Sequence, residues 1–260
     1  MSERQFHQRW KRRYQAALDD VQSILGECRR TGDAGAVHRL RVALRRLRLL
    51  ALVGKPVLGR PAALRLRQWA FALTDALSRV RDYDAALEWL QRQSPGTGPV
   101  EVLARTRRRL WRSSRPHLRT LSPDAIDDFS RTRAGSVKKK ALRKKYDREL
   151  ARARSAFEKD RRRFHELDLV GLHDFRRNIR RWRYMLELTR RRRAHKRDQE
   201  LKRLIALQEA LGEMQNCFLV RSFLQAQARF SARPKLRSLI KLQEARWLRL
   251  AERHLRAVSA

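Results

Sequence analysis

A short basic pattern occurs twice in this sequence, the second time 135 residues after the first. In each copy a histidine and four arginines stand at offsets 0, 3, 7, 8 and 10. The copies are His38, Arg41, Arg45, Arg46 and Arg48, and then His173, Arg176, Arg180, Arg181 and Arg183. At about 100° per residue, offsets 0, 3, 7 and 10 fall within about 80° of arc on an α-helix, next to an arc of apolar residues. Each copy therefore predicts a helix with one apolar face and a line of cations beside it.

We call these lines the first basic stripe (His38, Arg41, Arg45, Arg48) and the second basic stripe (His173, Arg176, Arg180, Arg183). The chain carries 64 Lys+Arg against 27 Asp+Glu, a formal net charge of +37, and such an imbalance costs stability unless an anion neutralises it. No acid stands between Val37 and Gly54. Arginine, which far outnumbers lysine, offers a planar fork of donors that suits phosphate oxygens. The stripes therefore predict a phosphate-rich anionic ligand.

The repetition extends beyond the two basic segments. Asp33 and Asp168 each lie five residues before the histidine of their copy. Downstream, residues 72–82 align with residues 206–216 at an offset of 134. Similarity in register over this separation indicates an internal duplication. We expect one domain over residues 1–260 that contains two repeats, over residues 1–122 and 136–260.

The fold class predicted from the periodicity is all-α. Leucine, alanine, arginine and glutamate recur at intervals of three and four residues, and strand-like alternation is missing. The expected helices cover residues 4–30, 36–53, 61–92, 99–120, 137–166, 171–190, 196–229 and 234–258. The third helix of each repeat has a candidate bend, near Arg81-Asp82 in the first and Gln215-Asn216 in the second. Antiparallel packing of such helices gives two four-helix bundles.

The cysteines and the N-terminal segment indicate where in the cell the protein resides. Cys28 and Cys217 fall in helical patterns without a partner at metal-ligand spacing, so we expect reduced core thiols and no metal ion or other cofactor. The N-terminal segment lacks the apolar stretch of a signal peptide, and no apolar run reaches membrane-spanning length. The expected location is the cytoplasm, with no membrane partner.

The two His-x-x-Arg-x-x-x-Arg-Arg-x-Arg helices, with Arg81-Asp82 and Asn216 in the helices that follow, resemble the CHAD family, named for its histidine-containing α-helical domain. The likeness runs from about residue 4 to 255. It implies two pseudo-symmetric four-helix bundles with a basic groove or channel between them, and both stripes would line that groove. It also implies binding of inorganic polyphosphate and localisation at polyphosphate granules.

The resemblance assigns roles to individual residues. Polyphosphate-binding residues would be His38, Arg41, Arg45, Arg46, Arg48, His173, Arg176, Arg180, Arg181 and Arg183. Supporting residues would be Arg81, Asp82, Tyr184, Asn216, Lys202 and Arg203. For Asp82 we favour a structural role, in which it accepts a hydrogen bond from a stripe arginine, over direct contact with the ligand.

Two departures from the family pattern leave equal affinity of the two repeats open. Ser78 stands where the family usually has glycine, which Gly212 retains in the second repeat. Asp174 adds an acid beside His173, although its helical angle directs it away from the stripe.

Other functions remain in view. The charge alone would also suit an RNA- or DNA-binding protein, but the sequence has no nucleic-acid recognition motif and no aromatic residue evidently placed for stacking on bases. A phosphoanhydride-processing enzyme would need clustered carboxylates for magnesium, or a nucleophilic histidine beside a base, and the stripes contain no carboxylate. We therefore expect a binding protein rather than an enzyme. Incidental nucleic-acid binding and a scaffold role on granules are both compatible with a polyphosphate-binding function. The sequence does not identify a protein partner.

Overall fold

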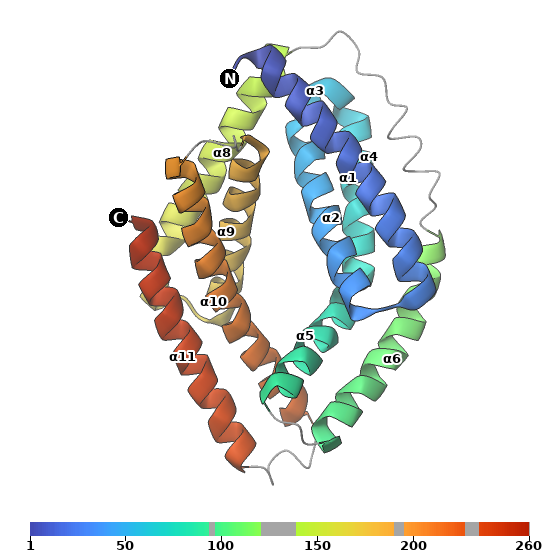
Figure 1. The fold of residues 1–260 in the computed structure, drawn as a ribbon, viewed down its shortest axis with the longest axis vertical. Coiled ribbons are helices and arrows are strands. Elements are labelled where there is room, and N and C mark those ends of the chain that lie inside the picture. Colours follow the sequence, from blue (N-terminus) through green and yellow to red (C-terminus); the bar gives the residue numbers. More distant parts are fainter. Residues whose placement is uncertain (94–96, 121–138, 190–194, 227–233, 260) are drawn as a thin grey trace. The chain divides into compact units, whose positions relative to one another are not determined.

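The computed structural model describes residues 1–93, 97–120, 139–189, 195–226 and 234–259, and every regular element within them is helical (Figure 1). The first repeat contains α1 (Glu3–Thr31), α2 (Ala34–Val53), α3 (Lys55–Leu58), α4 (Arg60–Ala76), α5 (Ser78–Gln93) and α6 (Thr97–Thr120). The second contains α8 (Lys139–Arg162), the 3-10 turn η1 (Phe164–Glu166), α9 (Leu169–Thr189), α10 (His195–Gln225) and α11 (Pro234–Ser259). The all-α prediction is confirmed. Residues 94–96, 121–138, 190–194, 227–233 and 260 lie outside this description, and with them the expected boundaries at residues 122 and 136.

The prediction of a single helix over residues 61–92 is wrong in one respect. The segment is two helices, because α4 ends at Ala76 and α5 begins at Ser78. The interruption lies at Leu77, before the candidate bend at Arg81-Asp82, and the Ser78 hydroxyl there donates a 2.7 Å hydrogen bond to the Asp75 carbonyl. Such a local bond competes with continuation of the helix. By contrast, α10 runs through Gln215 and Asn216 without a break.

Contacts divide the chain into two compact units. Unit 1 consists of Met1–Asp84 and Ala104–Glu149, and unit 2 of Ala85–Leu103 and Leu150–Ala260. The units therefore do not follow the order of the sequence repeats. The end of α5 and the start of α6 belong to unit 2, and the start of α8 belongs to unit 1.

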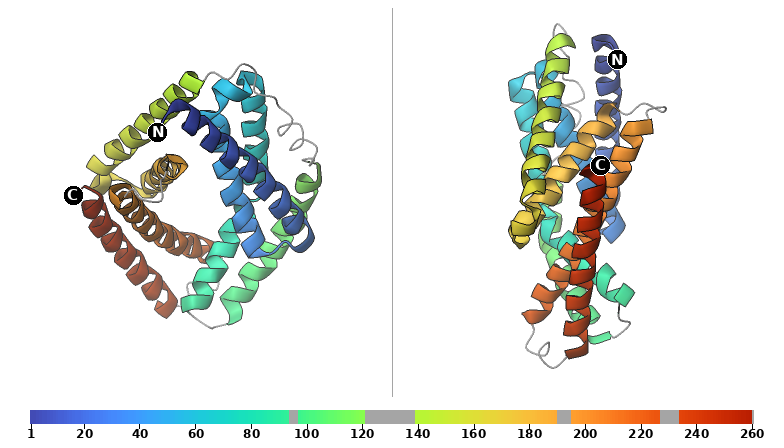
Figure 2. Two further views of the ribbon diagram at one scale, coloured as in Figure 1. Left: turned by 45° about the horizontal axis from the view of Figure 1, so that its top comes forward. Right: turned by 90° about the vertical axis from the view of Figure 1, so that its left-hand side faces the viewer.

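In unit 1, α2 packs against α1 on one side and α4 on the other (Figures 1 and 2). The rings of Trp10 and Tyr14 on α1 stack with centroids 5.2 Å apart, and the Trp10 indole N–H donates to the Leu50 carbonyl of α2 at 3.0 Å. Phe6 of α1 meets Tyr146 of α8 at 4.9 Å between centroids. These contacts bury the N-terminal helix against α2 and the start of α8.

A buried ion pair attaches α6 to the rest of unit 1. Arg107 Nε lies 2.7 Å from Asp84 Oδ1, and the Asp84 side chain is 2% exposed. Arg107 Nη2 also donates to the Gly32 carbonyl at 2.5 Å. Gly32 ends α1 with φ +60°, and a Cβ there would lie 2.3 Å from the Trp111 ring, so glycine is required at this corner.

In unit 2, α10 packs along both α9 and α11 (Figure 1). Phe157 of α8 lies against the apolar face of α9, with centroid distances of 5.5 Å to Phe175 and 4.7 Å to Trp182. Phe164 of η1 closes the same cluster, 5.9 Å from Phe175. This packing fixes which side of α9 is buried.

Candidate basic site

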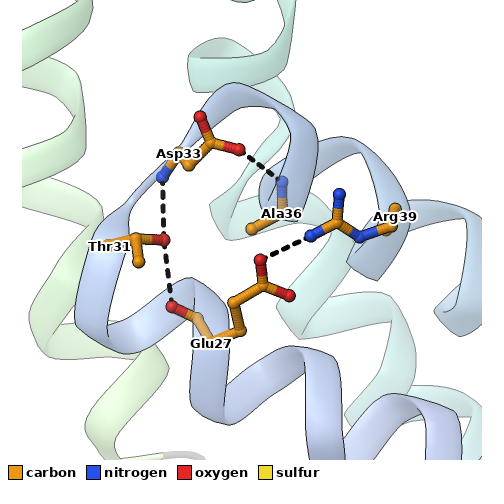
Figure 3. Close-up of polar contacts among 5 residues, drawn as sticks. All are labelled: Glu27, Thr31, Asp33, Ala36 and Arg39. Carbon is orange, nitrogen blue, oxygen red and sulfur yellow. Dashed lines mark hydrogen bonds and ion pairs between the residues drawn. The ribbon is translucent and has the colours of Figure 1, made fainter.

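The acid that precedes each basic segment is a helix N-cap. Asp33 Oδ2 accepts a hydrogen bond from the Ala36 amide at 3.1 Å at the start of α2, and Asp168 Oδ1 accepts one from the Gly171 amide at 2.8 Å at the start of α9. Figure 3 shows the first cap, where Thr31 also accepts from the Asp33 amide at 3.2 Å. Since an N-cap fixes where a helix begins, the two caps place both histidines equally far into their helices.

The stripes lie beside fully buried apolar residues, as the helical angles predict. Leu40, Leu44 and Leu47 on α2, and Phe175, Ile179 and Trp182 on α9, are at most 4% exposed. His38 and His173 are exposed, and the six arginines of the two stripes are half-buried. The guanidinium groups thus lie at the border between core and solvent.

One contact of the stripes is repeated in both units. Arg41 Nη1 donates to the backbone carbonyl of Thr74, and Arg176 Nε donates to the backbone carbonyl of Gln208 at 3.3 Å. Thr74 and Gln208 occupy equivalent positions in the two repeats. Each of the duplicated segments, 72–82 and 206–216, therefore contacts an arginine of the stripe in its own repeat.

Positive charge is crowded around the first stripe. Burial, and then the neighbouring charge of Arg45, lower the pKa of Arg41 to about 10. Asp82 and Asp75 act in the opposite direction on this pKa, while Arg81 lowers it further. The Nε atoms of Arg41 and Arg45 are buried and have no hydrogen-bond partner among the described residues. Asp82 is thus an electrostatic neighbour of the stripe, and its predicted hydrogen bond to a stripe arginine stays a prediction.

Three members of the second stripe contact neighbouring side chains. The Gln215 side chain donates to His173 Nδ1 and accepts from Arg176 Nη1 at 3.3 Å. Arg183 Nε lies 3.5 Å from Glu187 Oε1, and its guanidinium lies 4.9 Å from the centre of the Tyr184 ring. Sequence reasoning missed Gln215 and Glu187. The signal for Gln215 was available, because it stands at the position of Arg81 in the first repeat.

The other predicted residues lie around the stripes in different ways. Arg48 lies 5.0 Å from the centre of the Phe71 ring on α4, and Phe71 is 53% exposed. Asp174 pairs with Arg177 at 3.0 Å, and its direction away from the stripe stays a prediction. Five further positions differ in their exposure. Arg46 and Lys202 are exposed, whereas Arg181, Arg203 and Asn216 are half-buried.

No hydrogen bond or ion pair within the described ranges joins Lys202 or Arg203 to a stripe, so their supporting role stays a prediction. The first stripe belongs to unit 1 and the second to unit 2. The expected groove lined by both stripes also stays a prediction.

Comparison with known proteins identifies the family. The model of the CHAD domain family matches residues 12–225. The chain belongs to the CHAD domain family. The crystal structure of the CHAD domain from the plant Ricinus communis is similar to this CHAD domain, with a TM-score of 0.65 and 19% sequence identity over 96% of this chain and 91% of that chain. A search of curated proteins gives no match.

Two further sequence predictions concern this CHAD domain as a whole. Cys28 and Cys217 are free and buried, and burial raises the pKa of their thiols to about 11 and about 12. Both are therefore protonated core thiols near neutral pH, as expected from the helical patterns. No helix among the described residues has the length and apolar character needed to cross a bilayer.

Proposed function

We propose that this CHAD domain binds inorganic polyphosphate through the two basic stripes. The observation that carries the proposal is that the Nε atoms of Arg41 and Arg45 are buried without a hydrogen-bond partner among the described residues. Burial and the charge of Arg45 also lower the pKa of Arg41, and two carboxylates only partly offset the effect. A bound polyanion would relieve the repulsion between these guanidinium groups. Membership of the CHAD family supports the same ligand.

The shape of the stripes suits a linear anion. Ten residue steps separate the first and last cation of each stripe, which corresponds to about 15 Å along a helix axis. Polyphosphate presents about one charge per phosphate unit and no bases to be read, so a regular row of donors is what it requires. Binding would release condensed counterions, and affinity would fall steeply with added salt.

The test is charge reversal in both stripes. The double variant Arg45→Glu with Arg180→Glu is expected to lose binding of long-chain polyphosphate, while its helicity and melting temperature stay close to those of the wild type. The matched control is Arg12→Glu with Arg154→Glu, which changes the net charge equally at one exposed arginine of each unit. The proposal fails if the stripe variant binds polyphosphate like the wild type, or if the control loses binding to the same extent.

We also propose a binding role rather than a catalytic one, and residence at polyphosphate granules. Arginine and histidine dominate the stripes, whereas phosphoanhydride cleavage usually relies on carboxylate-held magnesium or a nucleophile beside a base. Phosphate release from polyphosphate in the presence of magnesium or manganese would contradict the first proposal. Failure of a fluorescent fusion to co-localise with granules would contradict the second.

One observation favours a second candidate, binding of single-stranded nucleic acid. The exposed ring of Phe71 lies beside Arg48 of the first stripe, and an aromatic ring next to a phosphate-binding cation is a platform on which a base can stack. Sequence reasoning found no such aromatic residue. Competition between long-chain polyphosphate and an oligonucleotide at fixed salt distinguishes the two ligands.

A further inference from the structure

A cavity of about 390 Å³ lies in unit 2, between the end of α10 and the start of α11. Three cations line it, Arg221 from α10 and Arg237 and Lys241 from α11. Gln225 and Ser238 add a neutral amide and a hydroxyl. This volume is near the lower end of the range for small-molecule sites, so the cavity suits a compact ligand. None of these residues belongs to either basic stripe.

The charges around the cavity favour an anion. Glu244 forms an ion pair with Arg221 at 2.6 Å and so offsets one of the three positive charges. Burial raises the pKa of Glu244, while the charges of Arg221 and Lys241 oppose that rise, which indicates that both cations lie near the carboxylate. Two positive charges are left without compensation by Glu244. A group with two negative charges would match them.

Arg221 is held in position before any ligand arrives. Its guanidinium bonds to Glu244 and lies 5.0 Å from the centre of the Phe218 ring, and the side chain is 27% exposed. A cation that is already ordered loses less conformational entropy on binding. The first repeat has Leu87 at the position of Arg221, so the duplication of the fold does not account for this arginine.

We propose that this cavity binds the terminal phosphate group of a linear phosphate compound, which carries up to two negative charges near neutral pH. Arg221 and Arg237 would donate to the phosphate oxygens as planar forks, and Lys241 would act as a point charge. Free pyrophosphate and the end of a longer chain both present such a group. Cyclic trimetaphosphate is anionic but has no terminal group.

The test measures binding of pyrophosphate and trimetaphosphate to the full chain by isothermal titration calorimetry. The double variant Arg237→Ala with Lys241→Ala is expected to bind pyrophosphate about tenfold more weakly or worse, because two charged contacts are lost. Both residues are exposed, so the fold should persist. The matched control is Arg249→Ala with Arg253→Ala, which removes two exposed arginines of α11 at the same spacing and should bind like the wild type.

The variant with Arg45→Glu and Arg180→Glu separates this proposal from polyphosphate binding by the stripes. It is expected to retain pyrophosphate binding. If it also retains a short linear polyphosphate, the cavity accepts chain ends, and if it retains pyrophosphate alone, the cavity is specific for the small anion. The cavity proposal is overturned if the Arg237/Lys241 variant binds pyrophosphate normally, or if trimetaphosphate binds as tightly as pyrophosphate.

Discussion

Gly212 leaves the space that the guanidinium of Arg176 occupies. A Cβ on Gly212 would lie 2.8 Å from Arg176 Nη2 and 3.2 Å from its Nε, closer than such atoms normally approach. The open space lets Arg176 reach the Gln208 carbonyl although α10 is continuous there. In the first repeat Ser78 takes the place of the glycine, and the helix is interrupted at Leu77 beside it. The two repeats thus give an arginine access to a backbone carbonyl by different means.

Replacing Gly212 with alanine should weaken polyphosphate binding and stabilise the folded protein. The added Cβ would clash with the far end of the flexible Arg176 side chain. We therefore expect that side chain to move while α10 stays intact. Affinity for polyphosphate should fall about threefold, because one charged contact is weakened. The free energy of unfolding should rise by about 1 kcal/mol, since alanine replaces glycine inside a helix. Urea unfolding and a binding isotherm measure the two effects, and a loss of stability would show that the backbone rather than Arg176 had moved.

Arg41 should stabilise the complex with polyphosphate but destabilise the free protein. Its pKa is lowered to about 10, so it stays protonated at neutral pH, and the buried charge costs free energy. We expect Arg41→Met to raise the free energy of unfolding by about 1 kcal/mol and to weaken polyphosphate binding about tenfold. Arg154→Met removes an exposed charge and should change neither quantity appreciably. Destabilisation by Arg41→Met would mean that the bond to Thr74 outweighs the cost of burial.

Glu187 should reduce the affinity of the second stripe. Its carboxylate lies 3.5 Å from Arg183, whereas the equivalent position in the first repeat is Leu52. We expect Glu187→Leu to strengthen polyphosphate binding about threefold, because Arg183 becomes free to pair with phosphate. Glu158→Leu is the matched control, since it removes the acid that pairs with Arg161 outside the stripes and changes the net charge equally. Equal strengthening by both variants would attribute the effect to net charge alone.

Periodicity predicted the helices and their buried faces, because both follow from residue spacing along one segment. It did not predict the interruption at Leu77, since leucine favours helix and the hydrogen bond from Ser78 to Asp75 could not be deduced from spacing. The expected helices also left residues 54–60 unassigned, and the short helix α3 lies there although Gly54 and Pro56 are typical of a loop. Tertiary context decided both cases.

The sequence could not predict which helices pack against one another, for a physical reason. An apolar face must be covered, but any apolar face of suitable length can cover it. The first part of α8 packs through Tyr146 against Phe6, in unit 1, and its later part packs through Phe157 in unit 2. The repeat boundary therefore did not predict the compact units. The stripes were predictable because a rule of helical spacing and a rule of charge both pointed to the same residues.

Asp84 should contribute strongly to the stability of unit 1. It is buried against Arg107, which also bonds to Gly32, so Asp84→Ala would leave a charged guanidinium without its carboxylate. We expect a loss of about 3 kcal/mol in the free energy of unfolding, measured with urea. The exposed pair of Arg39 and Glu27 provides a contrast, because its members are 51% and 38% exposed and Arg39→Ala should change stability little. Similar losses in both variants would contradict the importance of burial.

Phe71 provides the sharpest distinction between the two candidate ligands. Its exposed ring beside Arg48 can stack on a base, but it has no charge or hydrogen-bond donor for a chain of phosphates. We expect Phe71→Ala to weaken binding of a single-stranded oligonucleotide about tenfold, if the oligonucleotide binds at the first stripe, and to leave polyphosphate affinity within about twofold.

Leu64→Ala serves as the control, because Leu64 is 48% exposed on the same helix and has no aromatic ring. Fluorescence anisotropy with a labelled oligonucleotide, repeated over a salt series, measures the first affinity, and competition with polyphosphate measures the second. An unchanged oligonucleotide affinity in Phe71→Ala would show that no base stacks on this ring, and nucleic-acid binding would then be the unspecific attraction expected of a chain with a net charge of +37.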